Sequence, residues 1–203
     1  ETVRTRRKNR GNTPIKALSD PYPLKFTRDL WKTKTILVPN VSRAFCRIAT
    51  AAIRRQGFRV EPLPLGGRDA IKLGKQFVHN DICFPAQMNI GECLATLQSG
   101  QFDPDSVVLG LAKYQCDCRL AHYAALARKA LDEAGYRQVP IITTDKLDTK
   151  NMYPGFKLET GFELRMLWGL VMMDILEELR RKIRPYERNK GDTDAWFNQT
   201  IDQ

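Results

Sequence analysis

Five cysteines are the residues of this 203-residue chain whose type and spacing point most clearly to chemistry. Their number is odd and their spacing is irregular, which does not fit a disulfide framework. The first residues are charged rather than apolar, so we expect no secretion signal and a cytoplasmic protein, in which cysteines more often bind metal or react. The five are Cys46, Cys83, Cys93, Cys116 and Cys118.

Three of these cysteines have surroundings that suit thiolates. Cys83 stands two residues before Pro85, which fits the first position of a helix. Cys116 and Cys118 are separated by one residue, and Arg119 adds a fixed positive charge beside them. A helix N-terminus carries partial positive charge and free N–H groups, both of which lower the pKa of a nearby thiol. The pattern therefore favours a metal bound by Cys83, Cys116 and Cys118, with Arg119 beside it.

Two kinds of metal remain open from the residues alone. An iron–sulfur cluster is commonly bound by thiolates and gains from nearby cations and N–H donors. The same three thiolates with His79 or His122 would instead make a tetrahedral zinc set. Each histidine taken alone is more often structural.

Alternating strands and helices are expected to position these cysteines. Continuous apolar runs favour a parallel sheet covered on both faces. The expected fold class is α/β: a Rossmann-like, three-layer parallel sheet of about four strands with helices on both faces, plus a long C-terminal helix. Strands are predicted at 35–39, 58–63, 106–111 and 139–144, and helices at 42–56, 66–77, 85–100, 120–131 and 162–183.

Parallel strands place the starts of their connecting helices at one edge of the sheet, where such folds bind ligands. Cys83 directly precedes one predicted helix, and Cys116 and Cys118 lie between the third strand and the next helix. We therefore expect these three thiols at one edge. Cys46 is in the first turn of its helix and can reach that edge, whereas Cys93 is farther along; both are interpreted first as buried apolar side chains.

Several spaced motifs resemble the acyl-CoA dehydratase activase-related family. The run Asn80-Asp81-Ile82-Cys83-Phe84-Pro85-Ala86 resembles that family's N-D-x-C-[YF]-P-A segment. The pair Cys118-Arg119 with Tyr123 is similar to its C-R-x-x-x-Y segment. The resemblance covers about residues 35 to 194, and its further motifs are Arg128-Lys129-Ala130-Leu131, Ala134-Gly135-Tyr136, Val139-Pro140-Ile141, Pro154-Gly155-Phe156-Lys157 and Ile183-Arg184-Pro185-Tyr186-Glu187.

The resemblance implies a dehydratase-like part of a very large cytosolic protein from anaerobic bacteria, which also contains an ATP-binding activase part. It implies a [4Fe–4S] cluster held by Cys83 and Cys118, ATP-driven electron transfer, and a 2-hydroxyacyl-CoA substrate. The chain departs from the family at Gln115-Cys116-Asp117, where glycines or Gly-Pro are usual, so Cys116 is either an extra ligand or a sign that the cluster was lost. No residue is assigned as catalytic.

Charge and composition set the remaining expectations. The net charge is +10, and residues 1–34 hold ten basic and three acidic residues. We interpret 1–34 as a basic, largely irregular linker, 35–186 as the dehydratase-like domain and 187–203 as a frayed polar tail. Because the chain opens on Glu1, we expect an excised fragment whose partner is the rest of its polypeptide.

Three function classes rank lower. A non-catalytic docking or structural domain without a cluster is the main alternative, with 162–183 as its partner-facing helix. Nucleic-acid binding through residues 4–10 ranks last, because like-charge blocks usually form solvated arms. ATP hydrolysis by this chain is not expected, since it has no Walker-type loop. A membrane-spanning helix is not expected either. The longest uncharged run of the predicted helix at 162–183 is 166–173, far shorter than the ~20 residues that span a bilayer.

Overall fold

Four parallel strands form the centre of the molecule. The computed structural model describes residues 25–27, 29–111, 113, 118–144, 156 and 158–202. Within them, β1 (Thr35–Val38), β2 (Arg59–Pro62), β3 (Val107–Leu111) and β4 (Ile141–Thr143) make one sheet in the order β2-β1-β3-β4. All three strand pairs are parallel. The predicted α/β class with a four-stranded parallel sheet is confirmed.

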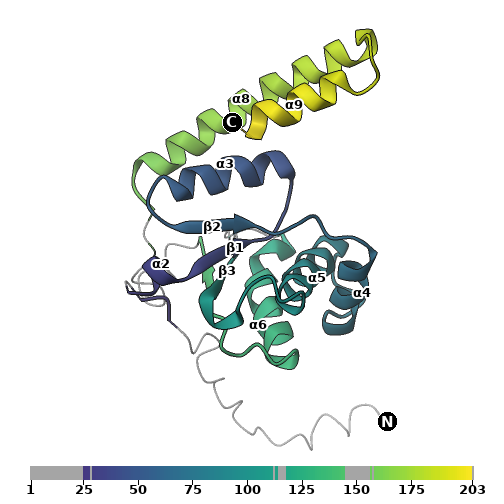
Figure 1. Cartoon of the computed structure of the whole chain (residues 1–203). Coiled ribbons are helices and arrows are strands. Elements are labelled where there is room, and N and C mark those ends of the chain that lie inside the picture. Colours follow the sequence, from purple (N-terminus) through teal and green to yellow (C-terminus); the bar gives the residue numbers. More distant parts are fainter. Residues whose placement is uncertain are drawn as a thin grey trace, which may run out of the picture.

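One face of the sheet is covered by three helices, α4 (Arg68–Phe77), α5 (Phe84–Gln98) and α6 (Tyr123–Glu133) (Figure 1). Side chains of a strand alternate between the two faces. Leu37, Leu109 and Ile141 point to this face and share a buried cluster with residues of α5 and α6. The larger of the two cores therefore lies beneath α5 and α6, the helices that follow the candidate cysteines.

The other face is covered by α2 (Leu30–Thr33) and α3 (Arg43–Arg54) (Figure 1). Ile36, Val108 and Ile142 form its buried centre. Phe26 is fully buried there and meets the ring of Phe156 edge to face at 6.5 Å. The fold thus begins before residue 35, where we had placed the end of the irregular linker, because Phe26 supplies an aromatic side chain to this core.

Local sequence signals set the ends of the helices. The Ser42 hydroxyl accepts the backbone N–H of Phe45 at 3.1 Å and caps α3. Pro85 occupies the first turn of α5. Gly57 and Gly135 follow α3 and α6 with positive φ angles of 88° and 89°, a conformation that glycine adopts without strain. The predicted helix boundaries are confirmed to within a few residues.

Helices α4 and α5 approach so closely that their contact requires glycine. A Cβ on Gly74 would lie 1.9 Å from the carbonyl oxygen of Gln87, and a Cβ on Gly91 would lie 1.9 Å from that of Ala70. Backbone therefore packs on backbone at two points. This contact fixes α5, and with it the start of α5 at Cys83.

The long C-terminal helix lies on another helix rather than on the sheet. Helix α8 (Gly161–Ile183) packs on α3, where a Cβ on Gly169 would lie 2.5 Å from the Cγ2 atom of Ile48. None of its residues is buried. The sequence predicts that residues 162–183 are buried, either against the sheet or against the rest of the parent polypeptide. The first alternative is wrong, because α3 already covers that face of the sheet and α8 packs on α3. The second alternative stays a prediction. No described helix is both long and apolar enough to cross a lipid bilayer.

Residues beyond Tyr186, expected to be a frayed polar tail, contain helix α9 (Asp192–Asp202). Its buried Phe197 lies under the guanidinium of Arg180, 4.8 Å from the ring centre. Arg180 also donates to Asp194 at 2.7 Å. Helix α9 turns back along α8 (Figure 1). The segment is therefore helical because it can bury Phe197 on one side, although its composition is polar overall.

Candidate functional site

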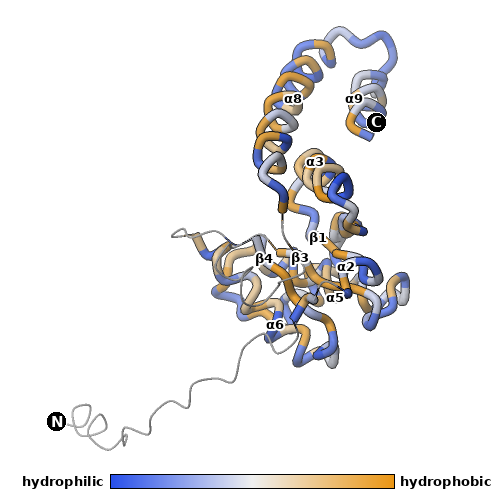
Figure 2. Tube along the Cα trace, turned by 90° about the vertical axis from the view of Figure 1, so that its left-hand side faces the viewer, coloured by the Kyte–Doolittle hydropathy of each residue, from blue (hydrophilic) through white to orange (hydrophobic). Residues whose placement is uncertain are grey.

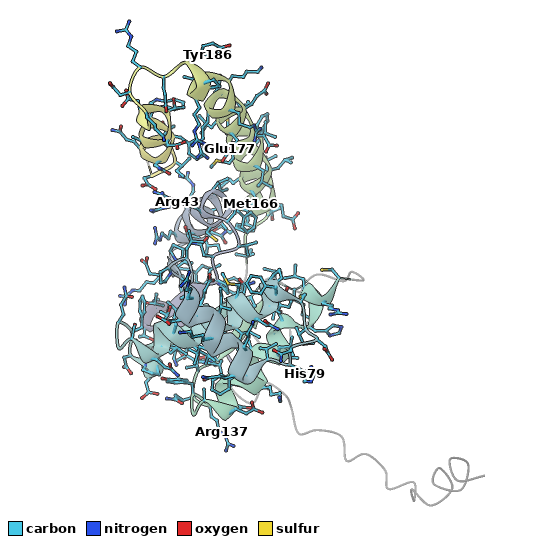
Figure 3. All side chains as sticks on the ribbon, turned by 90° about the vertical axis from the view of Figure 1, so that its right-hand side faces the viewer. Arg43, His79, Arg137, Met166, Glu177 and Tyr186 are labelled. Atoms are coloured by element: carbon cyan, nitrogen blue, oxygen red, sulfur yellow. The ribbon has the colours of Figure 1, made fainter. Side chains whose placement is uncertain are left out.

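The segments around Cys83 and Cys118 meet at the carboxyl edge of the sheet. After β3, the chain reaches Cys118, a 3-10 turn (Arg119–His122) and then α6. The backbone N–H of Lys113 donates to the Thr144 hydroxyl at 3.1 Å, which joins the ends of β3 and β4. We call residues 79–83 and 118–123 together the cysteine rim. Figure 3 places the labelled His79 of this rim on the α/β body, away from Glu177 and Tyr186 of α8 and its following turn.

Two hydrogen bonds join the halves of the cysteine rim. The Cys83 sulfur lies 3.0 Å from the Tyr123 hydroxyl. The Arg119 guanidinium donates to the carbonyl oxygen of Asp81 at 2.8 Å. These bonds connect residues 40 and 38 positions apart in sequence. The expectation that these two segments share one edge of the sheet is therefore met by the geometry.

Tyr123 is the centre of this arrangement. Its side chain is buried, with 5 % of the residue exposed. Burial raises the pKa of the Tyr123 hydroxyl, and the hydrogen bond and charge of Cys83 and the charge of Cys118 raise it further. The hydroxyl therefore stays protonated and can donate to a sulfur. Of the two thiols, Cys83 is the one in hydrogen-bond contact with this hydroxyl.

Cys83 has the surroundings of a stabilised thiolate. The hydrogen bond from Tyr123 lowers the pKa of the Cys83 thiol, and the Ala86 backbone N–H and the charge of Arg119 lower it further against a partial loss of solvent. Cys83 is the N-cap of α5, and its carbonyl oxygen accepts the backbone N–H groups of Ala86 at 3.0 Å and Gln87 at 3.4 Å. The partial positive charge of the helix start therefore lies beside Cys83. These are the features that favour nucleophilic or metal-binding cysteines.

A buried amide holds the loop before Cys83. The Gln87 side chain, 4 % exposed, donates to the carbonyl oxygens of His79 and Ile82, each at 3.3 Å. The His79 ring accepts the backbone N–H of Asp81 at 3.2 Å. Helix α5, through Gln87, therefore holds the 79–83 half of the cysteine rim in place.

The histidines of the alternative zinc set are on the surface. His79 and His122 are both exposed, and His79 faces the Asp81 carboxylate at 3.4 Å. Within the part of the chain that the structure describes, no three His, Cys, Asp or Glu side chains are grouped to hold a metal. Cys116, the third predicted thiol ligand, lies outside the described residues.

The two other cysteines belong to the interior. Cys46 is 1 % exposed, and its thiol donates to the Pro39 carbonyl oxygen at 3.4 Å. Cys93 is 3 % exposed and belongs to the core beneath α5 and α6. Burial raises the pKa of both thiols. Cys46 does lie near the carboxyl edge, because its thiol contacts Pro39, the residue after β1, but its sulfur is buried.

Sequence reasoning did not identify Tyr123 and Gln87 as residues of the site. In the sequence, Tyr123 stands out only as part of the C-R-x-x-x-Y motif. One feature of the sequence could have identified Tyr123. It lies at the start of the helix that follows Cys118, and a tyrosine hydroxyl on an otherwise apolar face needs a hydrogen-bond partner. Gln87 gave the matching signal, a polar residue on the buried side of α5.

No family model, curated protein or solved structure matches the chain. The class that the fold and rim define is therefore an α/β protein with two thiols at the carboxyl edge of its sheet.

Proposed function

We propose that this chain is an iron–sulfur-binding, dehydratase-like module of a larger 2-hydroxyacyl-CoA dehydratase activase-type protein. Cys83 and Cys118, together with Cys116, would hold the cluster at the cysteine rim. The observation that carries the proposal is that two hydrogen bonds join the segments of Cys83 and Cys118. The Tyr123 hydroxyl bonds to the Cys83 sulfur, and the Arg119 guanidinium, directly after Cys118, donates to the Asp81 carbonyl oxygen.

The side chains of the cysteine rim are of the chemical types that hold iron–sulfur clusters. Iron–sulfur clusters are held by cysteine thiolates and are tuned by hydrogen bonds to sulfur. Tyr123 supplies such a bond to Cys83, and Arg119 supplies a positive charge that offsets thiolate charge. A [4Fe–4S] cluster bound here would supply one-electron chemistry. Two ligands come from described residues, and Cys116 stands two positions before Cys118 in the sequence.

The family resemblance supplies the remaining parts of the proposal. Electrons would come from an ATP-binding activase part of the same polypeptide, and the substrate class would be a 2-hydroxyacyl-CoA. The compartment would be the cytoplasm. Within this chain, the cysteine rim would bind and orient the cluster, while α5 and α6 hold its two halves in place.

Anaerobic reconstitution with iron and sulfide tests the proposal. The full chain should gain a broad brown absorbance and bound iron, and Cys83→Ala and Cys118→Ala should each abolish both. Cys93→Ala is the matched control, because its buried sulfur is away from the rim, and it should keep the cluster. Cys116→Ala decides whether that residue is a ligand.

Metal analysis separates the proposal from its zinc alternative. Iron and sulfide in equal amounts indicate a cluster, whereas zinc without sulfide indicates a mononuclear site. Equal iron in the wild-type chain and in both rim variants would contradict the proposal. So would a reconstituted chain without iron and with all five thiols free to react.

A non-catalytic docking domain is the second candidate, and one observation favours it. Helix α8 exposes large apolar side chains, among them Leu164, Leu167 and Trp168 at 58 %, 58 % and 62 %. Exposed apolar surface of this kind marks interaction sites. A stable chain that never takes up iron, yet associates through α8, would favour this function over the first.

A further inference from the structure

Helix α8 exposes a continuous apolar stripe. We call it the outer stripe: Leu164, Trp168, Val171, Ile175 and Leu179, which are 40 % to 62 % exposed. Their spacing of three or four residues places them on one side of a helix. Of the fourteen exposed large apolar side chains in the described chain, nine are in α8. Figure 2 shows hydrophobic colour along the length of α8.

The outer stripe faces away from the rest of the molecule. The opposite side of α8 contacts α3 at Gly169 and meets α9 through Arg180 and Asp194. At about 100° per residue, Gly169 and Arg180 lie roughly opposite Val171 and Ile175. Within the described residues, α8 therefore already uses one side for the fold and leaves the second apolar side to solvent.

We propose that the outer stripe is the interface of a homodimer, in which α8 of one copy packs antiparallel on α8 of a second copy. A twofold interface requires a surface that is complementary to itself. A twofold axis between Val171 and Met172 places Leu164 opposite Leu179 of the second copy. The same axis places Trp168 opposite Ile175. Every member of the stripe then meets an apolar side chain.

The charges of α8 favour the same antiparallel arrangement. Its first turn carries Glu163, and its last turn carries Arg180, Arg181 and Lys182. Arg180 pairs with Asp194 and Lys182 pairs with Glu178, whereas Arg181 is 70 % exposed and its ion pair with Glu177 is long, at 3.9 Å. Antiparallel pairing brings Glu163 of one helix beside this Arg181 of the other, whereas parallel pairing would bring the two copies of Arg181 together. The opposed helix dipoles act in the same direction. Glu163 and Arg181 flank the stripe on the same side and would face one another across the interface.

The stripe has the dimensions and composition of a helix–helix interface. From Leu164 to Leu179 it extends about 22 Å at ~1.5 Å per residue. Trp168 lies within it, and tryptophan is one of the residue types enriched at interface hot spots. The proposal does not depend on a bound cluster.

Light scattering of the full chain at a series of concentrations tests the dimer. The wild-type chain should show twice its monomer mass at micromolar concentrations. Trp168→Glu should give the monomer, and Ile175→Glu should do the same as an independent variant. Leu65→Glu is the matched control, because Leu65 is 65 % exposed outside α8; it should remain dimeric. Circular dichroism should show unchanged helix content for all three variants.

Charge reversal tests the orientation. Glu163→Arg and Arg181→Glu should each weaken the dimer about 2- to 10-fold, as expected for exposed ion pairs. The double variant should restore the wild-type dissociation constant only if the helices are antiparallel. A chain that stays monomeric to about 100 µM, a range in which a specific interface of this kind would associate, overturns the proposal and leaves the stripe to another segment of the parent polypeptide. A dimer unaffected by Trp168→Glu overturns it as well.

Discussion

Two regions along one helix give cysteine opposite surroundings. Cys83, the N-cap of α5, is partly exposed, bonds to Tyr123 and has a lowered thiol pKa. Cys93, ten positions later, is 3 % exposed among apolar side chains, and burial raises its thiol pKa. The comparison teaches that depth along α5, rather than the presence of a cysteine, decides which thiol is available for chemistry.

The interior region should be the more sensitive to added volume. Gly91→Ala places a methyl group 1.9 Å from the carbonyl oxygen of Ala70, so α4 and α5 must separate. We expect a loss of about 3 kcal/mol in the free energy of unfolding, as for overpacking of a tight core. Urea unfolding followed by circular dichroism measures it.

Gly161→Ala is the control for this prediction. Its new methyl group would meet only the end of the flexible Arg165 side chain, at 3.2 Å. It should leave the free energy of unfolding within about 0.5 kcal/mol of wild type, the usual range for surface substitutions. If Gly91→Ala is as stable as Gly161→Ala, the close packing that fixes the start of α5 is not as described.

The interior also contains a carboxyl group, that of Glu92 beside Cys93. Its Oε1 atom accepts the backbone N–H of Gly66 at 2.8 Å, whereas its buried Oε2 atom has no partner within hydrogen-bond distance among the described residues. Burial raises the pKa of the Glu92 carboxyl. The folded state therefore holds this proton more tightly than the unfolded state, and stability falls as the pH rises from the unfolded pKa, about 4.3, through the higher folded value.

Glu92→Gln should remove that part of the pH dependence. At pH 8 the variant should be as stable as the wild-type chain or more stable by about 1 kcal/mol, because no buried charge has to be accommodated. Below pH 4 the two chains should converge. Urea unfolding at several pH values measures the difference; a variant that loses stability at pH 8 would show that the ionised carboxylate is required.

The strands and helices of the body were predictable because their signals are local. Ser42, Pro85 and Gly135 act within their own turn, and the apolar runs of β1, β3 and β4 are covered on both faces. The position of α8 was not predictable, because it depends on α3 covering that face of the sheet, which the sequence of α8 itself does not show. The close contact of α4 and α5 at Gly74 and Gly91 was not predictable either, because the sequence does not show which two helices pack together.

The site was predictable in outline and not in detail. The parallel topology alone brings residues 83 and 118 to one edge. The bond from the Tyr123 hydroxyl to Cys83 depends on side-chain direction in the first turn of α6, which no spacing rule specifies. The direction of the Cys46 thiol, which bonds to the carbonyl oxygen of Pro39, is likewise not specified by the sequence.

The rim thiol should respond to loss of its hydroxyl partner. Tyr123→Phe removes the hydrogen bond that is the largest cause of the lowered Cys83 thiol pKa, so this pKa should rise. Alkylation of Cys83 by iodoacetamide at pH 7 should slow by up to about fivefold, the factor that one net hydrogen bond provides. Mass spectrometry of the peptide that contains Cys83 measures the rate separately from that of Cys118.

Cys93 provides the internal reference in the same experiment. Its alkylation requires unfolding of the core, so its rate should be unaffected by Tyr123→Phe as long as the variant stays folded. Equal slowing at both cysteines would indicate a change in global stability instead of a local effect on the rim thiol.

Arg119→Gln should have the smallest effect of the series. Arg119 contributes a weaker part of the lowering of the Cys83 thiol pKa than Tyr123 does, through charge rather than through a hydrogen bond to sulfur. We expect alkylation of Cys83 to slow about twofold at low ionic strength. The difference should disappear near 1 M salt, where the screening length falls to ~3 Å, whereas the effect of Tyr123→Phe should persist. A salt-insensitive effect of Arg119→Gln would mean that its bond to the Asp81 carbonyl oxygen positions the rim, and that the rim thiol is controlled by geometry more than by charge.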